Sequence, residues 1–202
     1  MQALCDAGSG WGATWNQDGV IVYGTQNAGL WRVPAHGGTP AQLSAPNGAY
    51  TEFNHRWPVF LPGGSHYVYT VLGTADTAGI YLGAMESKER TKLTGDRSSS
   101  GYAEGPEGEG YLMVVRGTTL MAQRFDAGKR SLAGESFPIA ENVGVEFGGQ
   151  AVFSVSGNGM LVYGAGWGRQ TRLTWMDRAG KRLESLGDLG DLMQPTLLPD
   201  AK

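Results

Sequence analysis

The chain has 202 residues, of which 41% are hydrophobic and 17% charged, and its formal net charge is −3; this composition is typical of a folded globular protein and excludes a disordered chain. Its basic residues are scattered, so the sequence offers no concentrated positive face for nucleic acid. No apolar run approaches the roughly 20 residues of a membrane-spanning helix, and the single cysteine, Cys5, excludes an internal disulfide.

Glycine is the outlier of the composition. There are 33 glycines among the 202 residues, against a usual share of roughly 7%. They follow no Gly-x-y period, which excludes collagen, and they lie between short apolar runs, where tight turns need a positive φ. This distribution predicts many short strands joined by tight turns.

In chain order, two kinds of hairpin alternate. In the first kind, a glycine turn separates an aromatic strand from an alternating apolar strand, as in TWNQDGVIVYG; the turn glycines stand at positions 19, 64, 108 and 159, and PTLLPDAK begins a fifth copy. The second kind is a 14-residue strand–turn–strand unit with apolar ends, at 30–43, 80–93 and 173–186. Residues 120–140 repeat this unit with an insertion, and we expect the charged stretch ESKERTKL, at 86–93, to be a hairpin turn.

The spacing of the turn glycines indicates the fold. They are 45, 44 and 51 residues apart, close to the roughly 40–45-residue period of a four-stranded propeller blade. We therefore predict an all-β chain that forms a β-propeller of four-stranded antiparallel blades over residues 1–202. The predicted repeats are 9–52, 53–100, 101–147 and 148–190, with the start of a further repeat at 191–202. Propellers close with roughly 4–8 blades, and here four repeats are followed by only the start of a fifth. We therefore expect an incomplete arc of about four blades from a longer protein.

Five phrases in this order carry a family resemblance: GLWRVPAHGGTPAQLS, HRWPVFLPGGSHYVY, IYLGAMESKERTKL, GTTLMAQRFDAGKRSLAGESFPIAE and LTWMDRAGKRLESLG. Together they resemble the C-terminal propeller of bacterial eukaryotic-like serine/threonine protein kinases, a TolB-like and WD-repeat-like module. The resemblance implies a kinase domain and a membrane segment on the N-terminal side in the parent protein. It places this part on the extracytoplasmic or periplasmic side of a bacterial membrane, although the chain itself carries no targeting signal.

The chain departs from that family in two respects. The Pro-Asp-Gly turn typical of TolB-like repeats is replaced by related turns such as Gln-Asp-Gly and Pro-Gly-Gly, which still favour tight turns. No kinase element is present, because the sequence lacks a Gly-rich phosphate loop with a strand lysine, an Asp-Phe-Gly motif and the aspartate of a catalytic loop. We therefore expect no kinase activity in these residues.

The cluster His55-Arg56-Trp57 is the first candidate for ligand contact. Arginine suits an anion and tryptophan suits stacking, but the same residues also fit a structural role, which we favour: Trp57 packed between blades, with His55 and Arg56 bonded to backbone carbonyls. Trp11 and Trp167, which lie in glycine-rich loops, are further candidates for partner contacts.

No catalytic, cofactor or metal motif emerges. The three histidines are too widely spaced for a zinc motif, and neither a calcium loop nor a Gly-x-Ser-x-Gly elbow occurs. The carboxylates of Glu104, Glu107 and Glu109 stand in a turn, where exposure would not raise their pKa for acid–base work. We therefore predict no catalytic residue, no cofactor and no metal, and that the chain is not an enzyme.

These observations favour a non-catalytic sensor or interaction module that binds a protein, a peptide or a small ligand through blade loops, without a nucleic-acid partner. Two alternatives stay open: the propeller domain of a prolyl-oligopeptidase-like hydrolase, and a periplasmic TolB-like scaffold. The sequence leaves open the ligand, the blade number of the intact ring, the oligomeric state and the other domains of the parent protein.

Overall fold

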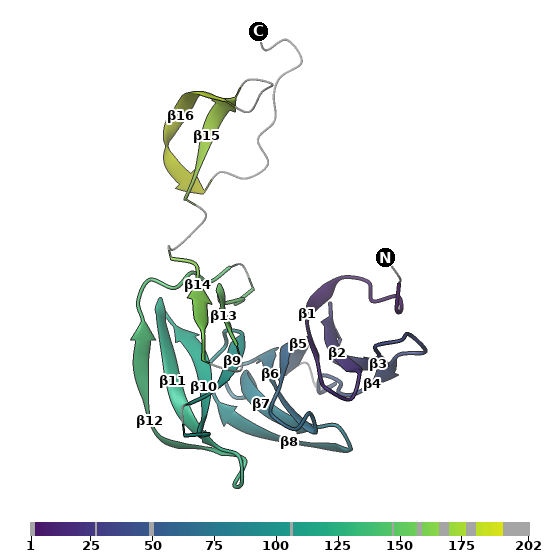
Figure 1. The fold of residues 1–202 in the computed structure, drawn as a ribbon. Coiled ribbons are helices and arrows are strands. Elements are labelled where there is room, and N and C mark those ends of the chain that lie inside the picture. Colours follow the sequence, from purple (N-terminus) through teal and green to yellow (C-terminus); the bar gives the residue numbers. More distant parts are fainter. Residues whose placement is uncertain are drawn as a thin grey trace.

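The computed structural model describes residues 3–26, 28–48, 51–105, 107–146, 148–156, 159–165, 170–176 and 181–191. Across these residues every regular element is a β-strand, and all strand pairs are antiparallel (Figure 1). Among them, no helix has the length and apolar character that crossing a lipid bilayer requires. The prediction of an all-β chain is confirmed.

Three four-stranded sheets follow one another along the chain, and in each the strands lie in sequence order. Blade 1 consists of β1 (Gly10–Trp15), β2 (Val20–Thr25), β3 (Leu30–Pro34) and β4 (Ala41–Gln42). Blade 2 consists of β5 (Glu52–Phe60), β6 (His66–Gly73), β7 (Gly79–Ala84) and β8 (Ser87–Thr94). Blade 3 consists of β9 (Ser100–Glu104), β10 (Gly110–Arg116), β11 (Thr119–Asp126) and β12 (Ser131–Ala140).

Two two-stranded sheets come next. β13 (Phe153–Val155) pairs with β14 (Leu161–Tyr163), and β15 (Gln170–Met176) pairs with β16 (Arg182–Asp191). The first strands of successive sheets contact one another, β1 with β5, β5 with β9, and β9 with β13. Figure 1 shows the sheets of blades 1 to 3 side by side. First strands that meet while the sheets fan outward are the arrangement of propeller blades.

The same glycine turn joins the first two strands of each repeat. The backbone N–H groups of Gly19, Gly64, Gly108 and Gly159 each donate to the carbonyl three residues earlier, at 3.2, 3.1, 3.0 and 2.9 Å. All four glycines have a positive φ, between +66° and +81°, a region that side chains with a Cβ disfavour. The spacing of these glycines therefore marks the repeats because each turn requires this conformation.

The second half of each repeat is a hairpin, as the second sequence pattern predicts. The units at 30–43, 80–93 and 173–186 correspond to the pairs β3–β4, β7–β8 and β15–β16. One detail of the prediction is wrong: residues 86–93 are not a turn, because the turn is at Met85 and Glu86 and most of this charged stretch forms the exposed outer strand β8. Charged side chains suit such a strand because they protect an unpaired sheet edge from association.

The hydrophobic core lies between the blades rather than within one sheet. On β6, the side chains of Tyr67, Tyr69 and Val71 pack with Val22 and Leu30 of blade 1, whereas Val68 faces the other way and packs with residues of blade 3. This alternation follows from the period of two along a strand. Blade 3 packs in the same way against the segment that leads into β13 and β14, so the middle strands are buried on both faces.

Candidate functional site

A buried polar group interrupts the apolar interface between blades 1 and 2. Glu52 and His55, both near the start of β5, are 6% and 0% exposed. Residues three apart in a regular strand point to opposite faces, but the pairing of β5 with β6 shifts register between Glu52 and Asn54. This irregularity brings both side chains to the same face of the blade, as bulges commonly do.

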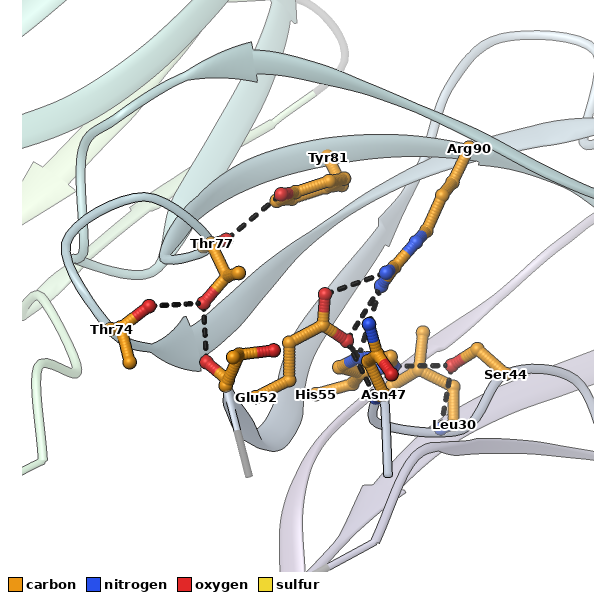
Figure 2. A network of polar contacts seen from close by, with 10 residues as sticks. Leu30, Ser44, Asn47, Glu52, His55, Thr74, Thr77, Tyr81 and Arg90 are labelled. Carbon is orange, nitrogen blue, oxygen red and sulfur yellow. Dashed lines mark hydrogen bonds and ion pairs between the residues drawn. The ribbon is translucent and has the colours of Figure 1, made fainter. Parts of the chain in front are cut away.

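Glu52, His55 and Ser44 form a continuous hydrogen-bonded chain, which Figure 2 shows. The Nε2 atom of His55 lies 3.2 Å from Oε2 of Glu52, and its Nδ1 atom lies 2.7 Å from Oγ of Ser44. Ser44 stands just beyond β4, in the segment that leads from blade 1 to blade 2. Its position is fixed by Leu30, whose N–H donates to Ser44 Oγ at 3.0 Å and whose carbonyl accepts from Ser44 N–H at 3.2 Å.

Arg90 on the outer strand β8 anchors the carboxylate of Glu52. Its Nη2 and Nη1 atoms donate to Oε1 and Oε2 at 2.6 and 2.9 Å, the two-point geometry in which arginine binds a carboxylate most strongly. The backbone N–H of Asn47 adds a third bond to Oε2 at 2.9 Å. The guanidinium also lies 5.1 Å from the ring centre of Tyr81, so β5, β7 and β8 all contribute to this contact.

Burial and charge set the protonation states of the group. Burial on its own would raise the pKa of Glu52, but the hydrogen bonds from Arg90, Asn47 and His55 outweigh it, so the pKa lies below its ordinary value. Burial lowers the pKa of His55, and the neighbouring Glu52 only partly opposes this effect. At neutral pH, Glu52 is therefore an anion and His55 a neutral imidazole.

These states define which nitrogen of His55 carries the proton. An ionised carboxylate only accepts hydrogen bonds. An unprotonated Nε2 would therefore set its lone pair against a lone pair of the Glu52 oxygen, and the two would repel each other. Arg90 Nη1 also approaches Nε2, but at 3.4 Å, and it already donates to Glu52. We therefore assign the proton to Nε2, which leaves Nδ1 free to accept the proton of the Ser44 hydroxyl.

The chain of contacts ends at a pocket. A cavity of about 290 Å³ opens between blades 1 and 2, and Ser44, His55, Tyr67, Tyr69, Lys88 and Arg90 contribute to its lining. A hydroxyl group that is bonded to a neutral histidine, which a carboxylate orients in turn, is the arrangement that activates serine as a nucleophile. Here the nucleophile would face a pocket that also carries two cationic side chains.

The structure separates the residues of the cluster proposed from sequence. His55 joins Ser44 and Glu52, not the backbone carbonyls that a structural role suggested. Arg56 and Trp57 instead meet Trp11: the guanidinium carbon of Arg56 lies 3.6 Å from the centre of the Trp11 ring and 5.8 Å from that of Trp57. Trp57 is buried, with 5% exposure. Trp167 lies outside the described residues.

Sequence reasoning missed Ser44, Glu52 and Arg90. No motif links them, because Arg90 is 38 residues from Glu52 and comes from the opposite edge of the blade. The one available signal was a glutamate at the head of the apolar strand EFNHRWPVF, since a charged residue in such a setting is rarely buried without a partner. Among the described residues, no group of three histidine, cysteine, aspartate or glutamate side chains is placed to hold a metal ion.

Comparison with solved structures identifies the architecture. A "putative gluconolactonase" superposes with a TM-score of 0.55 at 15% identity, over 86% of this chain and 62% of its own. Regucalcin from Agrobacterium tumefaciens, described as a calcium-binding protein, superposes with a TM-score of 0.54 at 13% identity, over 91% of this chain and 75% of its own. The fold is a β-propeller. No protein-family model matches the sequence, and neither does any curated protein.

The comparison corrects two predictions made from sequence. A propeller of similar fold is named as an enzyme, the putative gluconolactonase with a TM-score of 0.55. The expectations of a non-catalytic sensor module and of a chain that is not an enzyme are therefore wrong. The two alternatives, an oligopeptidase propeller and a TolB-like scaffold, do not match these neighbours well either. The resemblance to kinase propellers, and the location and partners that it implies, stay predictions.

Proposed function

We propose that this propeller is a hydrolase that cleaves a small ester or lactone in the pocket between blades 1 and 2, with Ser44 as the nucleophile. The observation that carries the proposal is the unbroken chain from Glu52 through His55 to Ser44, with contacts of 3.2 and 2.7 Å, that ends at the pocket. The name of one propeller of similar fold, a gluconolactonase, supports a lactone as the substrate. The chain spans 62% of that structure's length.

The proposed reaction has two steps. First, Nδ1 of His55 takes the hydroxyl proton of Ser44, and Oγ bonds to the substrate carbonyl carbon. The bond from this carbon to the alkoxide oxygen then breaks, and the alkoxide oxygen takes the proton from His55; an ester releases its alcohol at this point, whereas a lactone ring opens and keeps it attached. Water then attacks the acyl–serine ester, with His55 again as the base, and releases the acid and the serine hydroxyl. The carboxylate of Glu52 stabilises the imidazolium that forms in each step, and Arg90 holds this carboxylate in place.

The pocket suggests the class of substrate. Lys88, Arg90, Tyr67 and Tyr69 all contribute to its lining. Cationic groups beside a reacting carbonyl stabilise the oxyanion of the tetrahedral intermediate and favour a substrate that carries negative charge or many oxygens. A hydroxylated lactone of modest size fits both this chemistry and the volume of about 290 Å³.

A serine-reactive fluorophosphonate tests the nucleophile directly. Ser44 Oγ is expected to bond to phosphorus and displace fluoride, and mass spectrometry of the digested protein is expected to find the adduct on Ser44. Ser44→Ala removes this label, and His55→Gln slows labelling because the base is lost. Ser87→Ala, which alters another serine at the pocket, is the matched control and should label as the wild type does. A wild-type protein that takes no label on Ser44 would refute the proposal.

The pH dependence of hydrolysis gives a second test. Because the mechanism needs a neutral His55, kcat/KM should be constant at pH 7 and above and should fall on acidification. The inflection is expected below the ordinary histidine pKa of 6.5, since burial lowers the pKa of His55. Glu52→Gln removes the group that partly opposes this shift, so its inflection should move to still lower pH. An inflection above pH 7 in the wild type would contradict the assignment of His55 as the base.

A further inference from the structure

A second cluster lies among the first strands and shares no residue with the hydrolytic group. It consists of Trp11 on β1 with Arg56 and Trp57 on β5, and we call it the arginine–tryptophan cluster. The guanidinium carbon of Arg56 stacks 3.6 Å from the centre of the Trp11 ring. The two indole rings meet edge to face with centres 6.3 Å apart.

A strained backbone assembles this cluster. Consecutive side chains in a regular strand point to opposite faces, yet Arg56 and Trp57 both approach Trp11. The pairing of β5 with β6 shifts register between Arg56 and Val59, and Trp57 has a φ of +49°. Tryptophan in the left-handed region costs of the order of 1–2 kcal/mol. Residues held in such conformations are concentrated at ligand-binding and active sites.

The side chains of the cluster offer only hydrogen-bond donors, and three of these donors lack a partner in the part of the chain that the structure describes. Trp11 Nε1, Arg56 Nε and Trp57 Nε1 are buried and have no hydrogen-bond partner among the described residues. Within the same part of the chain, no carboxylate forms an ion pair with Arg56. Each buried donor without a partner costs roughly 1–3 kcal/mol. A hydrogen-bond acceptor placed among these donors would therefore be favourable.

The loop before β13 closes over one side of the cluster. A Cβ added at Gly148 would lie 3.1 Å from Arg56 Nη1, and one added at Gly149 would lie 3.5 Å from the Trp57 ring. Both glycines have a positive φ, +91° and +94°. The loop can approach the guanidinium this closely because glycine has no side chain. For the same reason, Gly148 and Gly149 bring no carboxylate to Arg56.

We propose that the arginine–tryptophan cluster binds an oxyanion, the carboxylate or phosphate of a small molecule. An oxyanion accepts several hydrogen bonds at once, and its negative charge would pair with the guanidinium of Arg56. Arginine and indole N–H groups supply the donors that such an anion needs. Trp11 holds the guanidinium in place by stacking, which keeps its donors oriented. The site is independent of the hydrolysis proposed above, because it shares no residue with the Ser44 pocket.

The indole N–H signals in a nitrogen–proton correlation spectrum report on this site directly. Titration with sodium gluconate and, separately, with inorganic phosphate is expected to shift and saturate the signals of Trp11 and Trp57, assigned from Trp11→Phe and Trp57→Phe. The signals of Trp15 and Trp31, which lie elsewhere on blade 1, should not move. Saturation by gluconate alone identifies a carboxylate site, by phosphate alone a phosphate site, and by both a general oxyanion site.

Arg56→Met keeps the hydrophobic stem and removes the charge. In calorimetric titrations it should weaken the binding of gluconate or phosphate, whichever saturates the indole signals of the wild type, at least tenfold. Arg124→Met, at an exposed arginine of blade 3, is the matched control and should bind as the wild type does, as should Ser44→Ala. If Arg56→Met fails to fold, the wild-type titration still decides the question. The proposal is overturned if neither anion shifts the Trp11 and Trp57 signals, or if a folded Arg56→Met protein binds with unchanged affinity.

Discussion

Replacing Ser44 with alanine is expected to lower kcat/KM for ester or lactone hydrolysis by roughly 1,000-fold or more, the scale on which loss of an activated nucleophile acts in serine hydrolases. The substitution removes the atom that forms the acyl intermediate, while Leu30 and His55 keep the rest of their packing. His55→Gln is expected to cost a similar factor, and the double variant little more, because the two residues act as one unit. Initial rates with a nitrophenyl acetate and with gluconolactone measure the effect.

The control for this experiment is Ser87→Ala, which changes a serine of the same pocket whose Oγ accepts from the N–H of Glu89 at 3.0 Å. Its rate should match the wild type within a factor of two to three. Circular dichroism and thermal melting establish that each variant is folded. A folded Ser44→Ala protein that hydrolyses both substrates at the wild-type rate would show that the Glu52–His55–Ser44 chain only stabilises the blade interface.

Replacing Arg90 with methionine is expected to lower the free energy of unfolding by about 3 kcal/mol, because it leaves a buried carboxylate without its cation. The side chain of Glu52 is 2% exposed and that of Arg90 29%, which places the effect near the lower end of the range for buried pairs. Methionine retains the length of the arginine stem, so little packing is lost. Urea unfolding at pH 7, followed by fluorescence, measures the change.

Two comparisons isolate the charge effect. The double variant Glu52→Gln/Arg90→Met should recover much of the loss, since it removes the unpaired charge as well. Arg116→Met breaks the pair with Asp96 on a more exposed surface, where Arg116 is 42% exposed, and should cost under about 1 kcal/mol. Equal losses for Arg90→Met and Arg116→Met would contradict the importance assigned to burial.

The pH dependence of the same variant follows from the lowered pKa of Glu52. A carboxyl group with a depressed pKa in the folded state adds stability above its unfolded pKa, and this contribution is lost as the pH falls through the folded value. The difference in the free energy of unfolding between the wild type and Arg90→Met should therefore have its full size at pH 7. It should shrink as the pH falls below the ordinary glutamate value of 4.5.

The sequence predicts the blades because their signals are local. The turn at Gly19 needs only a few neighbouring residues and a positive φ, and the alternation along HYVYT needs only the period of a strand. The same local reasoning failed at 86–93, where the charged composition suggested a turn. That stretch forms a strand whose backbone pairs with β7, and most of its residues are exposed.

The candidate site could not be predicted in the same way. Glu52 and His55 are three residues apart, a spacing that places side chains on opposite faces of a regular strand; only the register shift beside Glu52 brings them together. Ser44 and Arg90 reach His55 and Glu52 through the stacking of blade 1 on blade 2, which no local pattern encodes. Arg56 and Trp57 both meet Trp11 although they are consecutive residues, beside a register shift and a left-handed backbone at Trp57 that no local sequence pattern indicates.

The position of Ser44 in the connection between two repeats has an evolutionary consequence. Repeat proteins gain and lose repeats, here blades, by duplication and deletion at the junctions between them. A copy inserted between β4 and β5 would displace the serine from the imidazole that it contacts across this junction. We therefore expect related propellers that keep the hydrolytic group to differ in the number of blades elsewhere in the ring. They should retain blades 1 and 2 as neighbours.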